Sequence, residues 1–173
     1  MSTSRGWLGG ENQAMGGQQR QTRWLTPRHL VEPLGVFDLD PCGAPGHELA
    51  TRTYLLENGD DGLRDLWTGR VWLNPPYGKE APPFMAKLAE YGRGTALLFA
   101  RTETGMWHEH IWPKATAILF LRGRVSFLTP DGEKSGTSGA PSALIAYGAY
   151  DAYRLEVSGI PGQFLRLDRK AAA

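Results

Sequence analysis

Cysteine and long apolar runs are nearly absent from this chain of 173 residues. Cys42 is the only cysteine, so no disulfide can form within the chain. No group of Cys and His stands at metal-ligand spacing, and we expect no metal. No apolar run approaches the roughly 18 residues that span a bilayer, and residues 1–21 (MSTSRGWLGGENQAMGGQQRQ) lack the apolar centre of a signal peptide. The sequence therefore predicts a cytoplasmic protein.

An excess of charge is lacking as well. The formal net charge is +1 at pH 7, which argues against a protein that coats nucleic acid through its overall charge. A local basic face remains compatible with this total. Hydrophobic residues make up 41% of the chain, and its length suits one domain with a sizeable core.

The composition divides the chain into an arm and a domain. Residues 1–22 are rich in Gly, Gln and Ser, which predicts a disordered arm before one domain over residues 23–168. Thr26 and Pro27 predict the start of a short helix, with Thr26 as its cap and Pro27 at its first position. The Gly- and Ser-rich residues 129–141 predict a flexible loop.

Apolar stretches alternate with helical patterns along the domain. This alternation is typical of an α/β protein with a mixed, mostly parallel sheet. A turn at residues 122–124 (RGR) between two apolar stretches suggests a hairpin. The expected strands cover residues 36–40, 71–73, 95–100, 117–121, 125–128, 143–147 and 163–167, and the expected helices cover residues 82–91 and 105–114.

The segment VWLNPPYG at residues 71–78 ends an apolar strand in a rigid corner. Pro75 and Pro76 cannot donate a backbone N–H, and each fixes φ at about −65°. Ligands of open α/β sheets bind beyond the carboxyl ends of strands, where the Asn74 side-chain oxygen and the Pro75 carbonyl can accept from one flat –NH2 group. Tyr77 adds a ring on which a base can stack, worth about 1–3 kcal/mol. These features predict a pocket for the amino edge of adenine, although NPPY taken alone is equally typical of a turn.

Asn-Pro-Pro-Tyr after an apolar strand resembles the catalytic motif of S-adenosylmethionine-dependent amino methyltransferases. The ordered segments WLTPRHLVEPLG, FDLDPCGAP, NGDDGLRDLW, VWLNPPYG, ALLFARTETGMWHEHI, LFLRGRVSF and PSALIAYG resemble the small phage DNA adenine methyltransferases, the Dam-like phage family, over about residues 24–165. The resemblance implies a single-domain Rossmann-like methyltransferase fold that methylates adenine in DNA with S-adenosylmethionine. It also implies that the base is flipped out of the duplex and that Asn74, Pro75, Pro76 and Tyr77 form the catalytic corner.

The same resemblance implies a cofactor site around the first strand. The loop after that strand is expected at the methionine part of the cofactor, and acidic residues at a strand end commonly bind ribose hydroxyls, although a solvated strand end explains them as well. The usual G-x-G pattern appears here only as GAPG at residues 43–46, which departs from the family pattern. The expected cofactor-binding residues are Trp24, Thr26, Pro27, Asp38, Asp40, Pro41, Cys42, Gly43 and Asp61.

Four residues at the ends of strands are expected to bind DNA phosphates: Arg101, Thr102, Arg122 and Arg124. Surface salt bridges are an equally good interpretation of them. The motif also fits an amino group on cytosine N4, RNA or a glutamine side chain, and the weakened glycine loop keeps open a non-catalytic DNA-binding relative. The resemblance further suggests a phage- or prophage-encoded protein in a bacterial host cell that protects DNA from restriction.

Overall fold

The structure is a computed structural model that describes residues 25–129 and 134–167. The predicted N-terminal arm and the predicted cofactor contact of Trp24 lie outside these residues. All of the described residues lie within the expected domain, residues 23–168.

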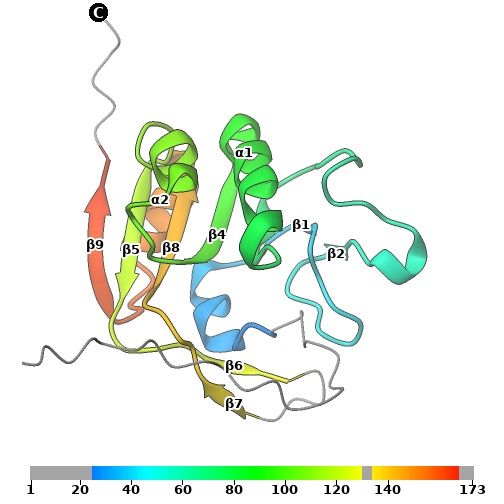
Figure 1. Cartoon of the computed structure of the whole chain (residues 1–173), viewed down its shortest axis with the longest axis horizontal. Coiled ribbons are helices and arrows are strands. Elements are labelled where there is room, and N and C mark those ends of the chain that lie inside the picture. The colour runs from blue at the N-terminus through cyan, green and yellow to red at the C-terminus, as the bar shows by residue number, and fades with distance from the viewer. Residues whose placement is uncertain (1–24, 130–133, 168–173) are drawn as a thin grey trace, which may run out of the picture.

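A seven-stranded sheet forms the centre of the protein, with strands in the order β2-β1-β3-β4-β8-β5-β9 (Figure 1). The pairs β1–β2, β1–β3 and β3–β4 are parallel, whereas β8 and β9 run against their neighbours. The predicted α/β class with a mixed sheet is confirmed. The strands are β1 (Leu39–Asp40), β2 (Arg52–Thr53), β3 (Val71–Leu73), β4 (Gly94–Phe99), β5 (Ala117–Leu121), β8 (Ser142–Tyr147) and β9 (Gly162–Arg166).

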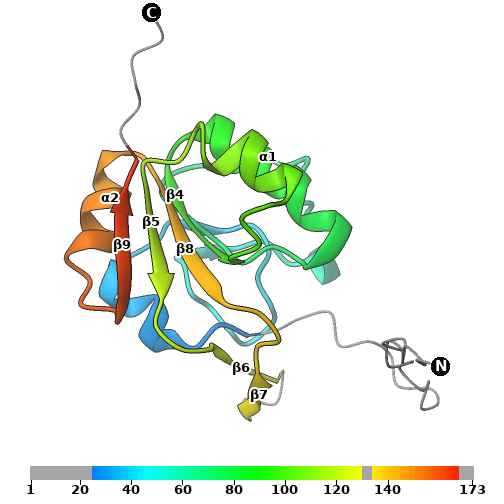
Figure 2. The same ribbon diagram turned by 60° about the vertical axis from the view of Figure 1, so that its left-hand side comes forward.

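Helical segments cover both faces of this sheet, and Figure 2 shows α1 and α2 on opposite sides of it. Alternate residues of a strand point to the two opposite faces of the sheet: Val71 and Leu73 pack with α1, while Trp72 packs with α2. The α1 face also carries η5, and the α2 face carries η1 and η2. The helical segments are η1 (Arg28–Leu30), η2 (Glu32–Leu34), η3 (Leu56–Asn58), η4 (Gly78–Glu80), α1 (Ala81–Tyr91), η5 (Trp107–Ile111) and α2 (Ala149–Glu156).

Strands β4 and β8 are the buried middle of the sheet. All six residues of β8 are buried, and β4 is buried except at its last residue, as the continuous apolar run predicts. Gly94 begins β4 at φ 150°, and a Cβ there would lie 2.4 Å from the carbonyl oxygen of Val71. The glycine therefore lets β4 pair closely with β3.

The predicted hairpin around residues 122–124 is wrong. Strand β5 pairs with β8 and β9, whereas β6 (Ser126–Leu128) leaves the main sheet and pairs with β7 (Lys134–Thr137). The prediction of a loop throughout residues 129–141 is also wrong, because β7 lies within it. Local sequence identified the strands but not their partners, since pairing depends on residues that are far apart in the chain.

The first ordered helix differs from its prediction by one residue. Pro27 is the N-cap of η1, with no side-chain cap, and Thr26 precedes it. The Thr26 hydroxyl does not cap the helix because it accepts a hydrogen bond from Asn74. The expected strand over residues 36–40 is shorter than predicted, since only Leu39–Asp40 pairs in the sheet.

The helix α2 is not predicted by the pattern, because its buried face carries a charge. Asp151 is 1% exposed and accepts hydrogen bonds from Arg70 Nε at 2.8 Å and from Thr95 Oγ1 at 3.0 Å. Arg70 Nη1 also donates to the carbonyls of Leu34 and Val36. This buried network ties α2, the start of β3 and η2 together.

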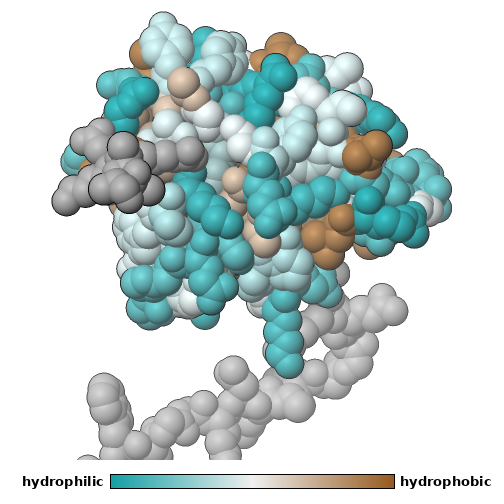
Figure 3. Space-filling model, turned by 90° about the horizontal axis from the view of Figure 1, so that it is seen from above, coloured by the Kyte–Doolittle hydropathy of each residue, from teal (hydrophilic) through white to brown (hydrophobic). Residues whose placement is uncertain are grey.

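The surface shown in Figure 3 lies at the amino ends of the parallel strands. It is mostly hydrophilic, with hydrophobic residues that are scattered rather than gathered in one patch. Over the described residues, no helix is both long enough and apolar enough to cross a membrane.

Candidate active site

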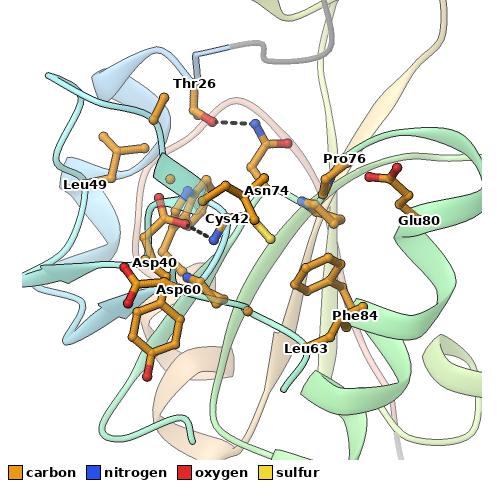
Figure 4. Close-up of a pocket in the computed structure, with 18 of the residues that line it drawn as sticks. Thr26, Asp40, Cys42, Leu49, Asp60, Leu63, Asn74, Pro76, Glu80 and Phe84 are labelled. Carbon is orange, nitrogen blue, oxygen red and sulfur yellow. Dashed lines mark hydrogen bonds between the residues drawn. The ribbon is translucent and has the colours of Figure 1, made fainter. Parts of the chain in front are cut away.

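A cavity of about 390 Å³ opens at the carboxyl ends of β1 and β3. The loop after β1, the corner after β3, the segment around η3 and the start of α1 form its walls (Figure 4). Its volume lies within the range of small-molecule sites, and its place at strand ends is where open α/β sheets bind ligands. The predicted residues that line it are Thr26, Asp40, Pro41, Cys42, Gly43, Asp61, Asn74, Pro75, Pro76 and Tyr77.

Asn74 lies at the end of β3 with its side chain in this cavity. Its amide nitrogen donates to Thr26 Oγ1 at 3.1 Å, and the amide oxygen lies on the opposite side, toward Pro76 (Figure 4). Thr26 is 1% exposed, and its carbonyl accepts a hydrogen bond from His47 Nε2 at 2.9 Å. The Asn74 amide is thus fixed at the wall of the cavity by a buried chain of hydrogen bonds, and its oxygen is itself buried.

Tyr77 packs against aromatic side chains of two other strands. Its ring stacks on Phe99 with centroids 4.4 Å apart and planes at 12°, and it meets Phe127 edge-on. Its hydroxyl is buried and finds no hydrogen-bond partner among the described residues, and this burial raises its pKa. One face of the Tyr77 ring is therefore covered by Phe99. Its buried hydroxyl has no hydrogen-bond partner among the described residues, which is typical of a binding site.

Asp40 is the buried acid of the cavity, with 4% of its surface exposed. Its carboxylate accepts a hydrogen bond from the backbone nitrogen of Cys42 at 2.9 Å (Figure 4). Burial outweighs this bond and raises the pKa of Asp40 to about 7. Burial and the nearby Asp40 and Glu80 carboxylates also raise the pKa of the Cys42 thiol, which keeps it protonated.

Two glycines let the walls of the cavity approach each other. A Cβ on Gly62 would lie 2.2 Å from the Pro41 carbonyl oxygen, and one on Gly43 would lie 2.1 Å from the Thr53 methyl. Larger residues at either position would push the loops apart. The loop after β1 and the loop around Gly62 therefore meet directly beside the cavity.

Asp61 uses its carboxylate to shape the chain. Its Oδ1 accepts hydrogen bonds from the backbone nitrogens of Leu63 and Arg64, and its own nitrogen donates to Asp65. This is the geometry of an Asx turn. Asp61 lines the cavity and also holds the turn that follows it.

Lys87 fastens the same segment to α1. Its ammonium group donates to the carbonyls of Gly62, Leu63 and Asp65 at 3.1, 2.9 and 2.7 Å, and it lies over the Trp67 ring. Desolvation lowers its pKa. One side chain of a regular helix therefore fixes a wall that has no regular structure of its own.

The family model for DNA N-6-adenine-methyltransferase (Dam) matches residues 14–158, which is most of the chain and includes every wall of this cavity. The chain belongs to the Dam family. No curated protein and no solved structure matches it. The Dam match agrees with the α/β sheet and supports methyl transfer to DNA.

Several residues that the sequence predicts for the Dam site lie outside the cavity. Asp38 is exposed, and its carboxylate accepts a hydrogen bond from the backbone nitrogen of Arg70 at 2.6 Å next to Gly69. Pro27 lines a second hollow rather than this one. The predicted DNA-binding residues Arg101 and Thr102 follow β4, and Arg122 and Arg124 follow β5; none of the four lines the cavity.

The structure adds lining residues that the sequence does not single out. His47, Tyr54, Glu80 and Phe84 come from segments without a motif, and Figure 4 shows Glu80 and Phe84 across the cavity from Asp40. Glu80 and Phe84 follow NPPY closely, so their nearness in sequence is a usable signal. His47 and Tyr54 give no such signal, because only the fold brings them to Thr26 and Asp40. Among the described residues, no three or more His, Cys, Asp or Glu side chains are placed to hold a metal ion.

Proposed function

We propose that this protein transfers a methyl group from S-adenosylmethionine to the exocyclic amino group of adenine in DNA. Membership of the Dam family supports the acceptor and the reaction class. The observation that carries the proposal is the fixed orientation of Asn74. Thr26 engages the donor end of its amide, and the acceptor end is buried at the cavity wall on the side toward Pro76.

The amino nitrogen of adenine is a poor nucleophile because its lone pair is delocalised into the ring. Hydrogen bonds from this amino group to the Asn74 oxygen and to the Pro75 carbonyl hold the nitrogen in line for attack. The same bonds stabilise the positive charge that grows on the nitrogen. The target base must leave the helical stack to reach this corner, where the Tyr77 ring lines the cavity and offers an aromatic contact to it.

The remaining walls of the cavity fit S-adenosylmethionine, which supplies an already activated methyl group. The carboxylates of Asp40, Asp60 and Glu80 line the cavity, and they suit a ligand that carries a sulfonium and an ammonium charge. Such a ligand favours the ionised form of Asp40. The rings of Tyr54 and Phe84 offer apolar surface to the adenosine part.

Incubation with labelled S-adenosylmethionine and unmodified DNA, followed by mass spectrometry of the nucleosides, tests the proposal. We expect N6-methyl-2′-deoxyadenosine from the DNA. Methylcytosine, labelled RNA or labelled protein would instead assign another amino acceptor. Absence of cofactor binding at millimolar concentration in a calorimetric titration would indicate a non-catalytic DNA-binding protein.

The variant Asn74→Ala separates catalysis from binding. We expect it to lose at least about 100-fold in turnover, as loss of a preorganised transition-state contact does, with little change in DNA affinity. Asn74→Asp keeps an acceptor oxygen and should retain more turnover than Asn74→Ala. Equal losses of turnover and of DNA affinity in Asn74→Ala would argue against the catalytic role.

We further propose that the protein works in the cytoplasm of a bacterial host cell, encoded by a phage or prophage, where its product protects DNA from restriction. Both substrates of the reaction are present in that compartment. Resistance of DNA from expressing cells to adenine-sensitive restriction endonucleases is the expected result.

A further inference from the structure

A second hollow lies at the carboxyl end of β5, next to the catalytic cavity. Its volume is about 870 Å³, and η1, the turn between β5 and β6 and the segment before β9 form its walls. We name it the basic groove after the side chains of Arg28, His29, Arg122 and Arg124 that line it.

The charge of the basic groove has one sign. Arg28 and His29 come from η1 on one wall, and Arg122 and Arg124 come from the β5–β6 turn on the other. All four are exposed, and no Asp or Glu is among the described residues that line the groove. Within residues 25–129 and 134–167, none of the three arginines forms an ion pair. Two opposed arginine walls suit an anion that runs between them, and guanidinium groups bind phosphate with two parallel hydrogen bonds.

The basic groove and the catalytic cavity share a thin wall. His47 lines both hollows, and the consecutive residues Thr26 and Pro27 line the cavity and the groove respectively. His47 is held in this wall by its bond to the Thr26 carbonyl. The groove therefore lies within reach of the units that neighbour one placed in the cavity.

The two sides of the basic groove are fastened to each other. Leu25 and Leu128 exchange backbone hydrogen bonds of 3.0 and 2.9 Å, which join the segment before η1 to the end of β6. The backbone segments that carry the arginines are therefore joined to each other before any ligand binds. A preformed site orders less on binding and so loses less affinity to entropy.

We propose that the basic groove binds the DNA phosphates that flank the base extruded into the catalytic cavity. This inference rests on the proposed function for its partner, but it assigns a separate surface with its own residues. Contacts in the groove supply affinity for DNA and fix the position of the DNA, while Asn74 and Tyr77 contact the target base.

The test measures binding of a short duplex oligonucleotide at several salt concentrations by fluorescence anisotropy. We expect Arg28→Ala/Arg122→Ala to weaken binding about 10- to 100-fold and to lower the slope of log affinity against log salt by about 2, one for each phosphate contact. Affinity for S-adenosylmethionine, measured by calorimetry, should not change. Arg28→Lys/Arg122→Lys should keep the salt slope, because it keeps both charges.

Arg166→Ala is the matched control, since Arg166 is an exposed arginine near the end of β9 that lies away from the groove and pairs with Glu156. It should leave affinity and salt slope unchanged. If Arg28→Ala/Arg122→Ala leaves the affinity for DNA unchanged, or if Arg166→Ala lowers it equally, the proposal for the groove is wrong. If the wild type binds DNA through these arginines yet yields no methylated nucleoside, the groove stands and the proposed reaction falls. If methylation proceeds and the double variant has an unchanged KM for DNA, the reaction stands and the groove falls.

Discussion

At the scale of single residues, the Thr26 hydroxyl anchors the Asn74 amide at the cavity wall by accepting a hydrogen bond from its nitrogen. The oxygen and the nitrogen of an amide have nearly the same shape, so only hydrogen bonding distinguishes the two orientations. Thr26→Val removes the acceptor and keeps the volume. We expect kcat to fall about 5-fold, which corresponds to the loss of one hydrogen bond of about 1 kcal/mol.

Thr26→Ser keeps the hydroxyl and should restore most of this turnover. Cofactor affinity, measured by calorimetry, should be similar in both variants, because the positioning effect acts through Asn74. Equal losses of kcat in Thr26→Val and Thr26→Ser would show that the methyl group matters and the hydroxyl does not.

The buried acid Asp40 makes stability depend on pH. Its pKa is about 7 in the fold and 3.8 in the unfolded chain, so the protonated form is favoured by folding. Its contribution is fully present below pH 3.8 and is lost as pH rises to about 7. Asp40→Asn mimics the protonated form. Without cofactor, the free energy of unfolding of the variant should therefore exceed that of the wild type by about 1–4 kcal/mol as the pH rises from 3.8 to 7.

Urea unfolding of both proteins at intervals between pH 4 and pH 8 measures this difference, in which the titration of other groups cancels. A difference in unfolding free energy that stays flat across the window would contradict the raised pKa of Asp40.

Residue positions are predictable here only where a motif fixes them. The NPPY corner is found in the cavity because the strand before it and the two prolines determine its place. Asp38 and Asp40 are indistinguishable in sequence, yet one bonds the Arg70 backbone outside the cavity and the other is buried inside it.

At the scale of elements, Lys87 of α1 holds the segment that follows η3. Lys87→Met keeps most of the apolar stem over Trp67 but removes three hydrogen bonds to carbonyl groups. We expect affinity for S-adenosylmethionine to fall about 10-fold because the freed wall must be ordered again on binding. Affinity for DNA should not change.

Glu90→Gln is the control, since Glu90 is exposed on the same helix. Hydrogen exchange should report faster exchange of residues 61–65 in Lys87→Met alone. Unaltered exchange and unaltered cofactor affinity in Lys87→Met would show that the segment holds its shape without the lysine.

The elements themselves are predictable where apolar periodicity is strong. The helix expected at residues 82–91 and the strand expected at 95–100 match α1 and β4 to within one residue. Helix α2 is missed because Asp151 occupies its buried face. The helix expected at 105–114 is cut short: Trp112 donates to Trp107, five residues back, and Pro113 cannot continue the helix.

At the scale of the whole molecule, the Arg70–Asp151 pair joins α2 to the sheet. Asp151→Asn leaves the Arg70 charge, 3% exposed, without its counterion in the core. We expect the free energy of unfolding to fall by about 3 kcal/mol, as for other broken buried pairs.

Glu156→Gln removes a surface pair instead, because Glu156 and Arg166 are about half exposed and 3.4 Å apart. That variant should change the free energy of unfolding by less than about 1 kcal/mol. Urea unfolding compares the two, and similar losses would mean that α2 does not depend on the buried pair.

Strand β8 lies between β4 and β5, although it comes after both in the chain. During synthesis on the ribosome, the edges of β4 and β5 that will pair with β8 therefore have unpaired backbone hydrogen-bonding groups until residues 142–147 emerge. Two unpaired apolar strand edges of this kind promote aggregation of nascent chains or their binding by a chaperone. A translation product that stops before residue 142 is thus expected to aggregate rather than to fold as a smaller domain.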